Sequence, residues 1–204
     1  MVENKSSDVI KFPPLTLLLV VGSFLVFLFP AVASYLIYDR EQLFAGEWWR
    51  LVTGILVHFS WTHLTYNAVI LLVAGWLLEG KNKARFLILI LATGLMSSMY
   101  FVLFLPDMNR YGGLSGIASA VVVYLCLLKI KERLPTRWIW VVILILFASK
   151  VFYESVMQQA FFVSYSSLMI NVVPSTHIIG AMVAVLMVGI RNWVQNIISG
   201  VRAL

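Results

Sequence analysis

One serine, two histidines and one asparagine have the residue types and positions needed for acyl transfer. Ser115 lies in the glycine-rich stretch RYGGLSGIASA, which separates two apolar runs of the chain. A serine hydroxyl becomes a nucleophile when a histidine at hydrogen-bond distance accepts its proton. We expect Ser115 to be the nucleophile and His177 the general base. His63, Asn67 and the backbone N–H of Ser115 are the candidate donors to the oxyanion that forms on the substrate.

The three histidines of the chain also allow two other interpretations, a zinc site and a proton or metal transport path. His58 and His63 are five residues apart, which puts them about 140° apart around a helix and not on one face as in a zinc-binding helix. His63 and Asn67, four apart, do share a face. The chain has no HExxH motif, and the inner halves of its apolar runs lack the polar groups that transport needs. We therefore expect neither a metal nor another cofactor.

The composition is that of a membrane protein. Of the 204 residues, 61% are hydrophobic and 12% are charged, whereas soluble domains have about 25% charged residues. The net charge of +6 comes from basic residues scattered between apolar runs. We therefore expect membrane lipids as partners and no nucleic acid. The single cysteine, Cys126, excludes an intramolecular disulfide.

Apolar runs of about 20 residues predict transmembrane helices. We expect an all-α membrane protein with six spans, over residues 14–38, 62–79, 86–105, 115–130, 138–157 and 174–191. The segment 39–61 is rich in tryptophan and phenylalanine, which favour the membrane interface, so it is expected to be a long outer interfacial loop. Residues 1–204 then form a single transmembrane domain with two cytoplasmic ends, 1–13 and 192–204.

The basic residues predict the orientation of these spans. With the N-terminus in the cytoplasm, eleven of the fifteen Lys and Arg residues lie in inner segments, and three, Arg40, Arg50 and Arg110, lie in outer ones. An excess of Lys and Arg marks the cytoplasmic side. All three histidines, Asn67 and Ser115 then lie near the outer side. Residues 1–35 also allow a second interpretation, a cleaved signal peptide ending at AVA, but their apolar stretch is long for one and we expect a retained helix.

Pairs of small residues follow both candidate catalytic residues. Gly116 and Ala120 are four apart at the start of one predicted span, and Gly180 and Ala184 are four apart just after His177. Such pairs let two membrane helices approach closely, which would bring Ser115 and His177 to one level. For these residues alone, ordinary helix packing with an idle serine is the simpler alternative.

Four motifs between residues 46 and 184 resemble those of the rhomboid intramembrane serine proteases. The chain has GGLSGIASA where that family has GxSGxxxA, HFSWTHLTYN for HxxxxHxxxN, EWWR for a Trp-Arg motif and THIIGAMVA for AHxxGxxxG. The resemblance implies a six-helix rhomboid-like bundle and a Ser115–His177 dyad without an acidic third member. It implies structural roles for His58 and for a set of further residues: Glu47, Trp49, Arg50, Gly113, Gly116, Ala120, Gly180 and Ala184.

The resemblance also implies a serine endopeptidase of the bacterial inner membrane, which cleaves membrane-anchored substrates near the outer, periplasmic border of a span. The chain departs from the family at Ser119, where an aromatic residue often stacks on the base histidine, and at Thr176 and Ala184, where alanine and glycine are usual. The main alternative is an inactive rhomboid-like protein that binds membrane clients. The complete set of Ser115, His177, His63 and Asn67 argues against that alternative.

Three stretches, GEWWRLVTG, SKVFYESV and VPSTHIIGA, resemble the bacterial rhombosortases in particular. That branch implies single-span substrates with a C-terminal tail made of a Gly/Ser-rich stretch, one span and basic residues. Lys150 and Glu154 lie four apart in the fifth predicted span and could form an ion pair on one helix face. The sequence leaves open whether this pair is structural or contacts the substrate.

Overall fold

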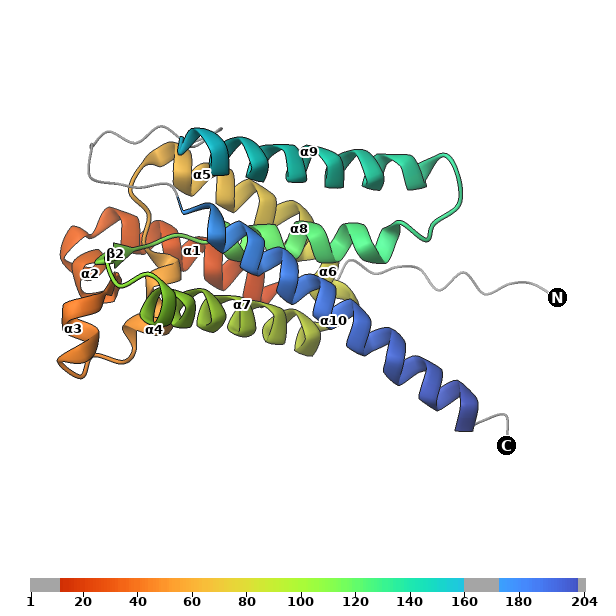
Figure 1. Cartoon of the computed structure of the whole chain (residues 1–204), viewed down its shortest axis with the longest axis horizontal. Coiled ribbons are helices and arrows are strands. Elements are labelled where there is room, and N and C mark those ends of the chain that lie inside the picture. Colours follow the sequence, from red (N-terminus) through yellow and green to blue (C-terminus); the bar gives the residue numbers. More distant parts are fainter. Residues whose placement is uncertain (1–11, 160–172, 202–204) are drawn as a thin grey trace.

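The computed structural model describes residues 12–159 and 173–201, and this part of the chain is almost entirely helical (Figure 1). The expected all-α membrane class is confirmed, and the helices are joined by a two-residue antiparallel strand pair in which Tyr38 lies opposite Tyr111. In chain order the elements are α1 (Pro14–Leu28), α2 (Pro30–Leu36), β1 (Tyr38–Asp39), α3 (Arg40–Phe44), α4 (Arg50–Thr53), the 3-10 turn η1 (Gly54–Leu56), α5 (Trp61–Ile70), the π-helical η2 (Leu71–Gly75), α6 (Trp76–Lys81), α7 (Lys83–Phe104), β2 (Arg110–Tyr111), α8 (Ser115–Lys129), α9 (Thr136–Met157) and α10 (Pro174–Val201).

Four helical segments are long and apolar enough to cross a membrane, and the bent pair α1–α2 would make a fifth. The four are Trp61–Lys81, Lys83–Phe104, Thr136–Met157 and Pro174–Ser199. The predicted number of six spans stays a prediction, because α8 has only 15 residues. At 1.5 Å per residue α8 is roughly 22 Å long, which is shorter than the roughly 30 Å of the hydrocarbon core.

The first predicted span is broken, so a continuous helix over 14–38 is wrong. Helices α1 and α2 meet at an angle of 117°, with Phe29 between them at φ −119° and ψ 88°. Pro30 follows, and proline both lacks an N–H and disfavours helical dihedrals in the residue before it. The chain therefore turns sharply where the sequence still reads as one apolar run.

The other end of α1 is fixed to the bundle by Glu79 of α6. Its carboxylate accepts hydrogen bonds from the backbone N–H groups of Leu15 and Thr16, each at 2.8 Å, and from the Thr16 hydroxyl at 2.9 Å. The first N–H groups of a helix have no partner within the helix, so this buried carboxylate caps α1. The described part of the segment that also allowed a signal-peptide interpretation, from residue 12 onward, is thus packed into the fold.

Helix α10 is longer than the sequence predicted. It continues to Val201, ten residues past the predicted end at 191, so most of the predicted C-terminal tail is helical. The run NWVQNIIS contains no proline to end the helix. In Figure 1 this last part of α10 projects beyond the other helices.

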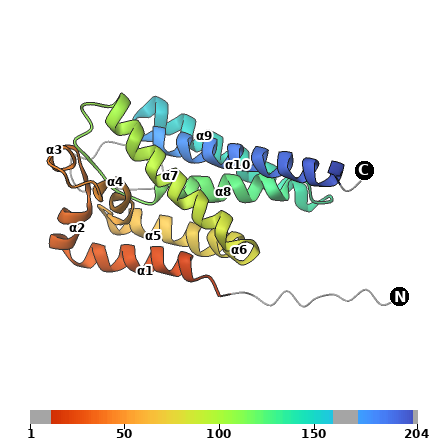
Figure 2. The same ribbon diagram turned by 90° about the horizontal axis from the view of Figure 1, so that it is seen from below.

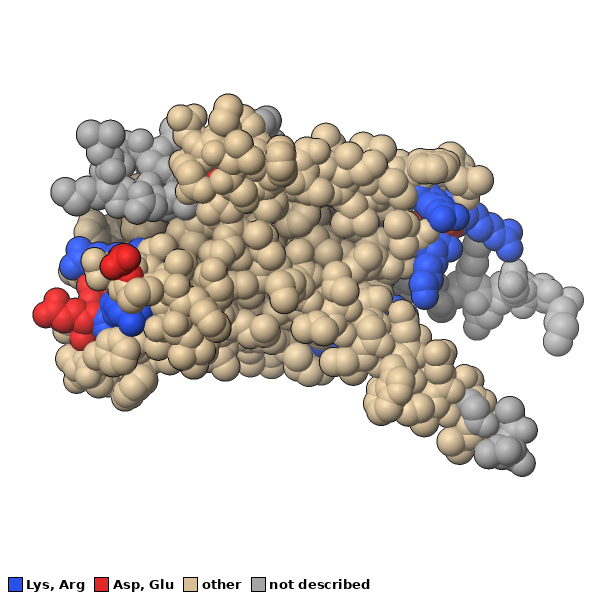
Figure 3. Space-filling model, in the orientation of Figure 1, with Lys and Arg blue, Asp and Glu red and all other residues tan. Residues whose placement is uncertain are grey.

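The surface has the charge pattern of a membrane protein. Figure 3 shows most of the visible charged side chains at the two ends of the molecule, with an uncharged band between them. Helices α7, α9 and α10 expose large apolar side chains, for example Leu95, Ile145 and Leu186. Such a band fits the lipid hydrocarbon, and the chain is a multi-pass membrane protein.

Helix α8 is the centre of the bundle. Figures 1 and 2 show it surrounded by α5, α7, α9 and α10. Ten of its 15 residues are buried, from Gly116 to Cys126. The most extensive helix packing in the described chain joins α8 to α10. Ser115 is therefore the first residue of the most enclosed helix.

Candidate active site

The turn before Ser115 depends on Gly113. Its φ of +128° is a backbone conformation that residues with a side chain rarely adopt. A Cβ at this position would lie 2.5 Å from Cε1 and 2.7 Å from Nε2 of His63. The glycine therefore lets the chain turn into α8 while its backbone touches the His63 ring. This close approach is a structural reason for the supporting role predicted for Gly113.

Two backbone contacts fix the same turn to the interfacial loop. The Gly113 N–H donates to the carbonyl of Gly54 at 3.2 Å, and Tyr111 pairs with Tyr38 in the β1–β2 ladder. Gly54 itself has no room for a side chain, since a Cβ there would lie 2.8 Å from the Tyr38 nitrogen. The loop that precedes α5 thus sets the backbone position from which α8 starts.

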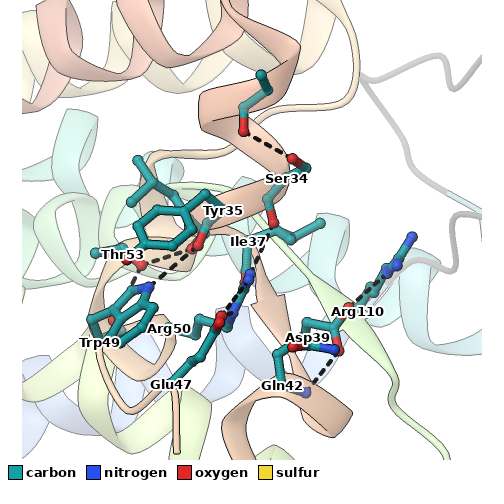
Figure 4. A network of polar contacts seen from close by, with 12 residues as sticks. Ser34, Tyr35, Ile37, Asp39, Gln42, Glu47, Trp49, Arg50, Thr53 and Arg110 are labelled. Carbon is teal, nitrogen blue, oxygen red and sulfur yellow. Dashed lines mark hydrogen bonds and ion pairs between the residues drawn. The ribbon is translucent and has the colours of Figure 1, made fainter. Parts of the chain in front are cut away.

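Arg50 holds that loop together from inside (Figure 4). Its guanidinium is buried, forms an ion pair with Glu47 at 2.6 Å, and donates to the carbonyls of Ser34 at 2.9 Å and Ile37 at 2.8 Å. Trp49 donates its indole N–H to the carbonyl of Tyr35 at 3.3 Å. The three residues expected to brace the loop therefore tie it to α2 and to the residues before β1.

A second ion pair links the loop to β2. Arg110 donates through Nε to the Asp39 carboxylate at 3.0 Å, and Asp39 also accepts the Gln42 N–H at the start of α3. Figure 4 shows this pair beside the Arg50 group. The strand pair, which the sequence did not predict, thus has side-chain support on both strands.

His58 joins three elements around the Ser115 turn. Its Nδ1 lies 3.1 Å from the Leu56 carbonyl, and its Nε2 lies 3.2 Å from Asn67 Nδ2 and 3.5 Å from the Leu114 nitrogen. Burial lowers the pKa of His58 to about 4, so the ring is neutral at pH 7. One tautomer satisfies every contact: Nδ1–H donates to Leu56, while Nε2 accepts from Asn67 and Leu114.

The two side chains predicted as oxyanion donors have different surroundings. The His63 ring lies beside Gly113, 4.8 Å from the His58 ring and stacked against Phe59 at 6.4 Å. Asn67 instead directs one amide N–H to His58, so only its second N–H can serve a substrate. His63 therefore contacts the Ser115 turn directly, whereas Asn67 contacts His58, which in turn contacts Leu114.

His177 contacts Ser119 rather than Ser115. Its Nδ1 lies 2.8 Å from the Ser119 hydroxyl, which in turn donates to the Ser115 carbonyl at 2.9 Å. The Ser115 hydroxyl lies 3.4 Å from the hydroxyl of Tyr111. Between Ser115 Oγ and the His177 ring, both within the described chain, no hydrogen bond is formed. The structure thus brings the predicted base to the first turn of α8, and the predicted direct bond is not made in it.

The other nitrogen of the His177 ring faces α9. Nε2 lies 3.2 Å from the Glu154 carboxylate and 3.2 Å from Lys150 Nζ, and these two side chains pair with each other at 2.7 Å. Sequence reasoning found the Lys150–Glu154 spacing but missed its contact with His177. The available signal was two charges within an apolar helix, which are costly unless paired or functional.

Small residues bring α8 and α10 together where the sequence predicted. A Cβ on Gly180 would lie 2.2 Å from the Gly116 carbonyl oxygen and 3.0 Å from the Ala120 nitrogen. Ala120 and Ala184 are fully buried. This backbone contact fixes His177, one turn before Gly180, against the first turn of α8.

These groups can carry out nucleophilic acyl transfer. A hydroxyl at a helix N-terminus, a neighbouring imidazole and donors beside the intervening turn are the parts that this chemistry requires. Among the described residues, no group of three His, Cys, Asp or Glu side chains could hold a metal ion.

Comparison with known proteins adds a family. The Rhomboid domain family matches residues 45–193 of the chain. YdcA of Bacillus subtilis (strain 168) is 29% identical over 141 residues, which are 65% of this chain and 71% of YdcA. The rhomboid protease GluP of the same organism is 32% identical over 111 residues, or 53% of this chain and 22% of GluP. The rhomboid protease GlpG of Yersinia enterocolitica is 33% identical over 114 residues, or 53% of this chain and 38% of GlpG. The match thus covers less than half the length of GluP and GlpG.

Proposed function

This chain belongs to the rhomboid family of intramembrane serine proteases, and we propose on that premise that it is a serine endopeptidase with Ser115 as nucleophile and His177 as base. One observation carries the assignment. The imidazole of His177 lies against the first turn of α8, with Nδ1 2.8 Å from a hydroxyl that is itself bonded to the Ser115 backbone. In the proposed reaction the Ser115 side chain rotates toward this ring, which then receives its proton.

Ser115 is a better nucleophile than Ser119, although Ser119 is in contact with the base. The Ser119 hydroxyl is buried and donates its one proton to a backbone carbonyl. Ser115 is only partly buried and begins α8. A helix N-terminus carries partial positive charge and N–H groups without intrahelical partners, both of which favour an anion. The alkoxide and the oxyanion are thus stabilised at Ser115 and not one turn further in.

The reaction follows from these positions. The Ser115 hydroxyl turns from Tyr111 toward His177 and attacks the substrate carbonyl, while the ring nitrogen that faces α8 takes the proton. Such hydrogen bonds are often formed only in the substrate complex. The backbone N–H of Ser115 and the His63 ring stabilise the oxyanion, and Asn67 contributes its second N–H. His177 then protonates the leaving amine, and water releases the acyl group from Ser115.

The orientation and substrate are further parts of the proposal. The distribution of basic residues supports a bacterial inner-membrane protein with a cytoplasmic N-terminus and a site facing the periplasm. In this proposal residues 1–204 form one domain and α1 is retained. The hydrogen bonds that Glu79 accepts from the start of α1 support its retention. Substrates are single-span membrane proteins cut near the outer border of the span. The GEWWRLVTG, SKVFYESV and VPSTHIIGA stretches favour the rhombosortase branch and its Gly/Ser-rich, C-terminal tails.

A second candidate function is client binding without cleavage. The observation in its favour is that Ser115 and His177 form no hydrogen bond with each other in the described chain. This function would retain the fold and the interfacial loop but would show no serine chemistry.

A labelling experiment separates these possibilities. The purified protein is incubated with a fluorophosphonate, which reacts with activated serines, and with a substrate carrying a Gly/Ser-rich tail. We expect the label on Ser115 by peptide mass spectrometry, cleavage near the outer end of the substrate span, and loss of both in Ser115→Ala. A label on Ser119 would overturn the nucleophile assignment. A wild-type protein that neither cleaves nor reacts would favour client binding.

A further inference from the structure

We propose that Glu154 is a positioning residue for His177, so that the site is a Ser115–His177–Glu154 triad in which Lys150 opposes the carboxylate. The proposal rests on the proposed function and adds an acidic member to the dyad that the family resemblance implies. Its basis is the juxtaposition of one carboxylate and one ammonium group at the same ring nitrogen.

The burial of Glu154 is not explained by the apolar, lipid-facing character of α9. Among the 22 residues of α9 it alone is buried, with 2% of its surface exposed. A carboxylate away from water is costly unless it is paired. If pairing with Lys150 were its whole purpose, the pair could lie anywhere along the helix. It lies instead on the face where both side chains reach Nε2 of His177 at 3.2 Å.

The two charges select opposite tautomers of the neutral ring. A carboxylate only accepts, so contact with Glu154 requires a proton on Nε2 and leaves Nδ1 bare. An ammonium only donates, so contact with Lys150 requires a bare Nε2 and puts the proton on Nδ1. Nδ1 is the nitrogen that faces α8 and its serines. When Nδ1 carries the proton, it donates to the Ser119 oxygen, and the Ser119 hydroxyl donates to the Ser115 carbonyl. When Nδ1 is bare, the Ser119 hydroxyl turns its proton from that carbonyl to Nδ1. Glu154 therefore selects the tautomer that can accept the Ser115 proton, and Lys150 selects the one that cannot.

Glu154 also favours the charged state that follows proton transfer. Once His177 has accepted the proton, both nitrogens carry N–H groups, and Nε2–H points to the carboxylate. Charge interactions in a site with little water are much stronger than in bulk solvent. Lys150 reduces this stabilisation, since it places a like charge beside the imidazolium. The balance between the two side chains of α9 thus sets the basicity of His177.

The other titratable groups near the ring leave this role to Glu154. Two side chains of α5 lie within electrostatic range of this group. His63 interacts with the His177 ring and with Lys150, and Tyr66 interacts with Glu154. Tyr111 contacts the Ser115 hydroxyl. Within the described part of the chain, Glu154 is the acidic side chain in contact with His177.

Variants of the pair test the proposal. Glu154→Gln keeps the shape and removes the charge, Glu154→Asp keeps the charge, and Lys150→Met removes the opposing charge. Glu132→Gln is the matched control, because Glu132 pairs with Lys129 at the far end of α8. For each variant we measure kcat and KM, the rate and final stoichiometry of fluorophosphonate labelling, and the dependence of kcat on pH.

We expect Glu154→Gln to lower kcat and the labelling rate by ~10²-fold, the size of a general-base contribution, with KM and labelling stoichiometry unchanged. Glu154→Asp should retain most of the activity. The acid limb of the pH profile should move in opposite directions in Glu154→Gln and Lys150→Met, because one loses a negative and the other a positive charge beside the ring. Glu132→Gln should behave as wild type. Wild-type kinetics in Glu154→Gln, or a loss matched by lower stoichiometry, would show a purely structural pair and overturn the proposal.

A measurement without catalysis separates this proposal from the proposed function. In Ser115→Ala labelled with ¹⁵N-histidine, NMR reports which nitrogen of His177 carries the proton. We expect a proton on Nε2, and a shift of the population to Nδ1–H when Glu154→Gln is added. An unchanged tautomer would overturn the role of Glu154 even if the enzyme is active. An inactive wild type with the expected shift would overturn only the proposed function.

Discussion

Helices α8 and α9 both contribute to the site, but they are held in the bundle in opposite ways. Two thirds of α8 is buried, and α10 approaches it so closely that a methyl group on Gly180 would meet the Gly116 carbonyl. α9 is longer, and its one buried residue is a glutamate. The position of Ser115 and His177 is therefore set by backbone contact, whereas α9 acts on His177 through side-chain charge.

The two helices should therefore tolerate different kinds of change. Close-packed interiors respond to a single added or removed carbon atom, so the α8–α10 contact should be sensitive to size. α9 should be sensitive to charge at two positions and tolerant elsewhere, because lipid can fill whatever space a lost side chain leaves.

Loss of either reacting group should have the largest effect. Ser115→Ala and His177→Ala should each abolish detectable cleavage, and the double variant should be no worse than either, since the two residues act as a unit. Cleavage of a tailed substrate, followed by gel or mass spectrometry, measures this. Near-normal turnover in Ser115→Ala would remove α8 from the chemistry and leave it only a packing role.

A large residue at the α8–α10 contact should come next. Gly180→Leu should lower activity by at least ~10²-fold, because its side chain would meet Gly116 and Ala120 and move His177 away from α8. Insertion should survive, since leucine is favourable in a span. Gly189→Leu is the control on the same helix, as nothing lies within 4 Å of a Cβ there. Equal activity in the two leucine variants would show that close approach is not required.

The stability of the folded protein should fall at acidic pH because of His58, on the interfacial side of the site. Its pKa is lowered from 6.5 to about 4 in the folded chain because the ring is buried. The unfolded state then binds more protons between these values, so this contribution to stability is present above pH 6.5 and is lost as the pH falls toward 4. The shift corresponds to about 3 kcal/mol at most.

Unfolding in detergent at several pH values measures the His58 effect. His58→Gln should be less stable than wild type at pH 7.5, because an amide cannot reproduce the donor to Leu56 and the acceptor for Asn67 in the same geometry. Its stability should also depend less on pH between 4 and 6.5. An equal slope in both proteins would assign the acid sensitivity to other groups.

Sequence patterns predicted the parts of this site that depend on local spacing. The start of α8 at Ser115, the facing pairs Gly116/Ala120 and Gly180/Ala184, and the Lys150–Glu154 ion pair all follow from helical periodicity, and the structure contains them. The family prediction is confirmed by the match to the Rhomboid domain over residues 45–193.

The features that the sequence did not predict depend on how separate elements meet. Spacing along α9 shows that Lys150 and Glu154 share a face, but not that this face meets His177. Likewise, the sequence shows that Ser119 stands where an aromatic residue often stacks on the base histidine, but not that its hydroxyl is hydrogen-bonded to the His177 ring. The bend at Phe29 was hidden because hydropathy is unchanged across Pro30.

Loss of the Ser119 hydroxyl, on α8, should have a moderate effect on activity. Ser119→Ala removes the hydroxyl that holds Nδ1 of His177, and one such hydrogen bond is worth about 1 kcal/mol. We expect kcat to fall by roughly 5- to 10-fold with KM unchanged, and labelling of Ser115 to persist. Complete loss of labelling in this variant would point to Ser119 as the nucleophile, contrary to the proposed function.

The smallest effect is expected on the outer face of α9. Ile145 of α9 has 58% of its surface exposed, whereas Ile117 of α8 has 1%. The same change to alanine should therefore cost about 0.5 kcal/mol or less at Ile145 and about 2–5 kcal/mol at Ile117, where it leaves a cavity. Unfolding by titration with a denaturing detergent compares the two variants directly. A large cost at Ile145 would mean that α9 packs against another surface in the membrane. The position of α9 would then depend on that contact as well as on its side-chain charges.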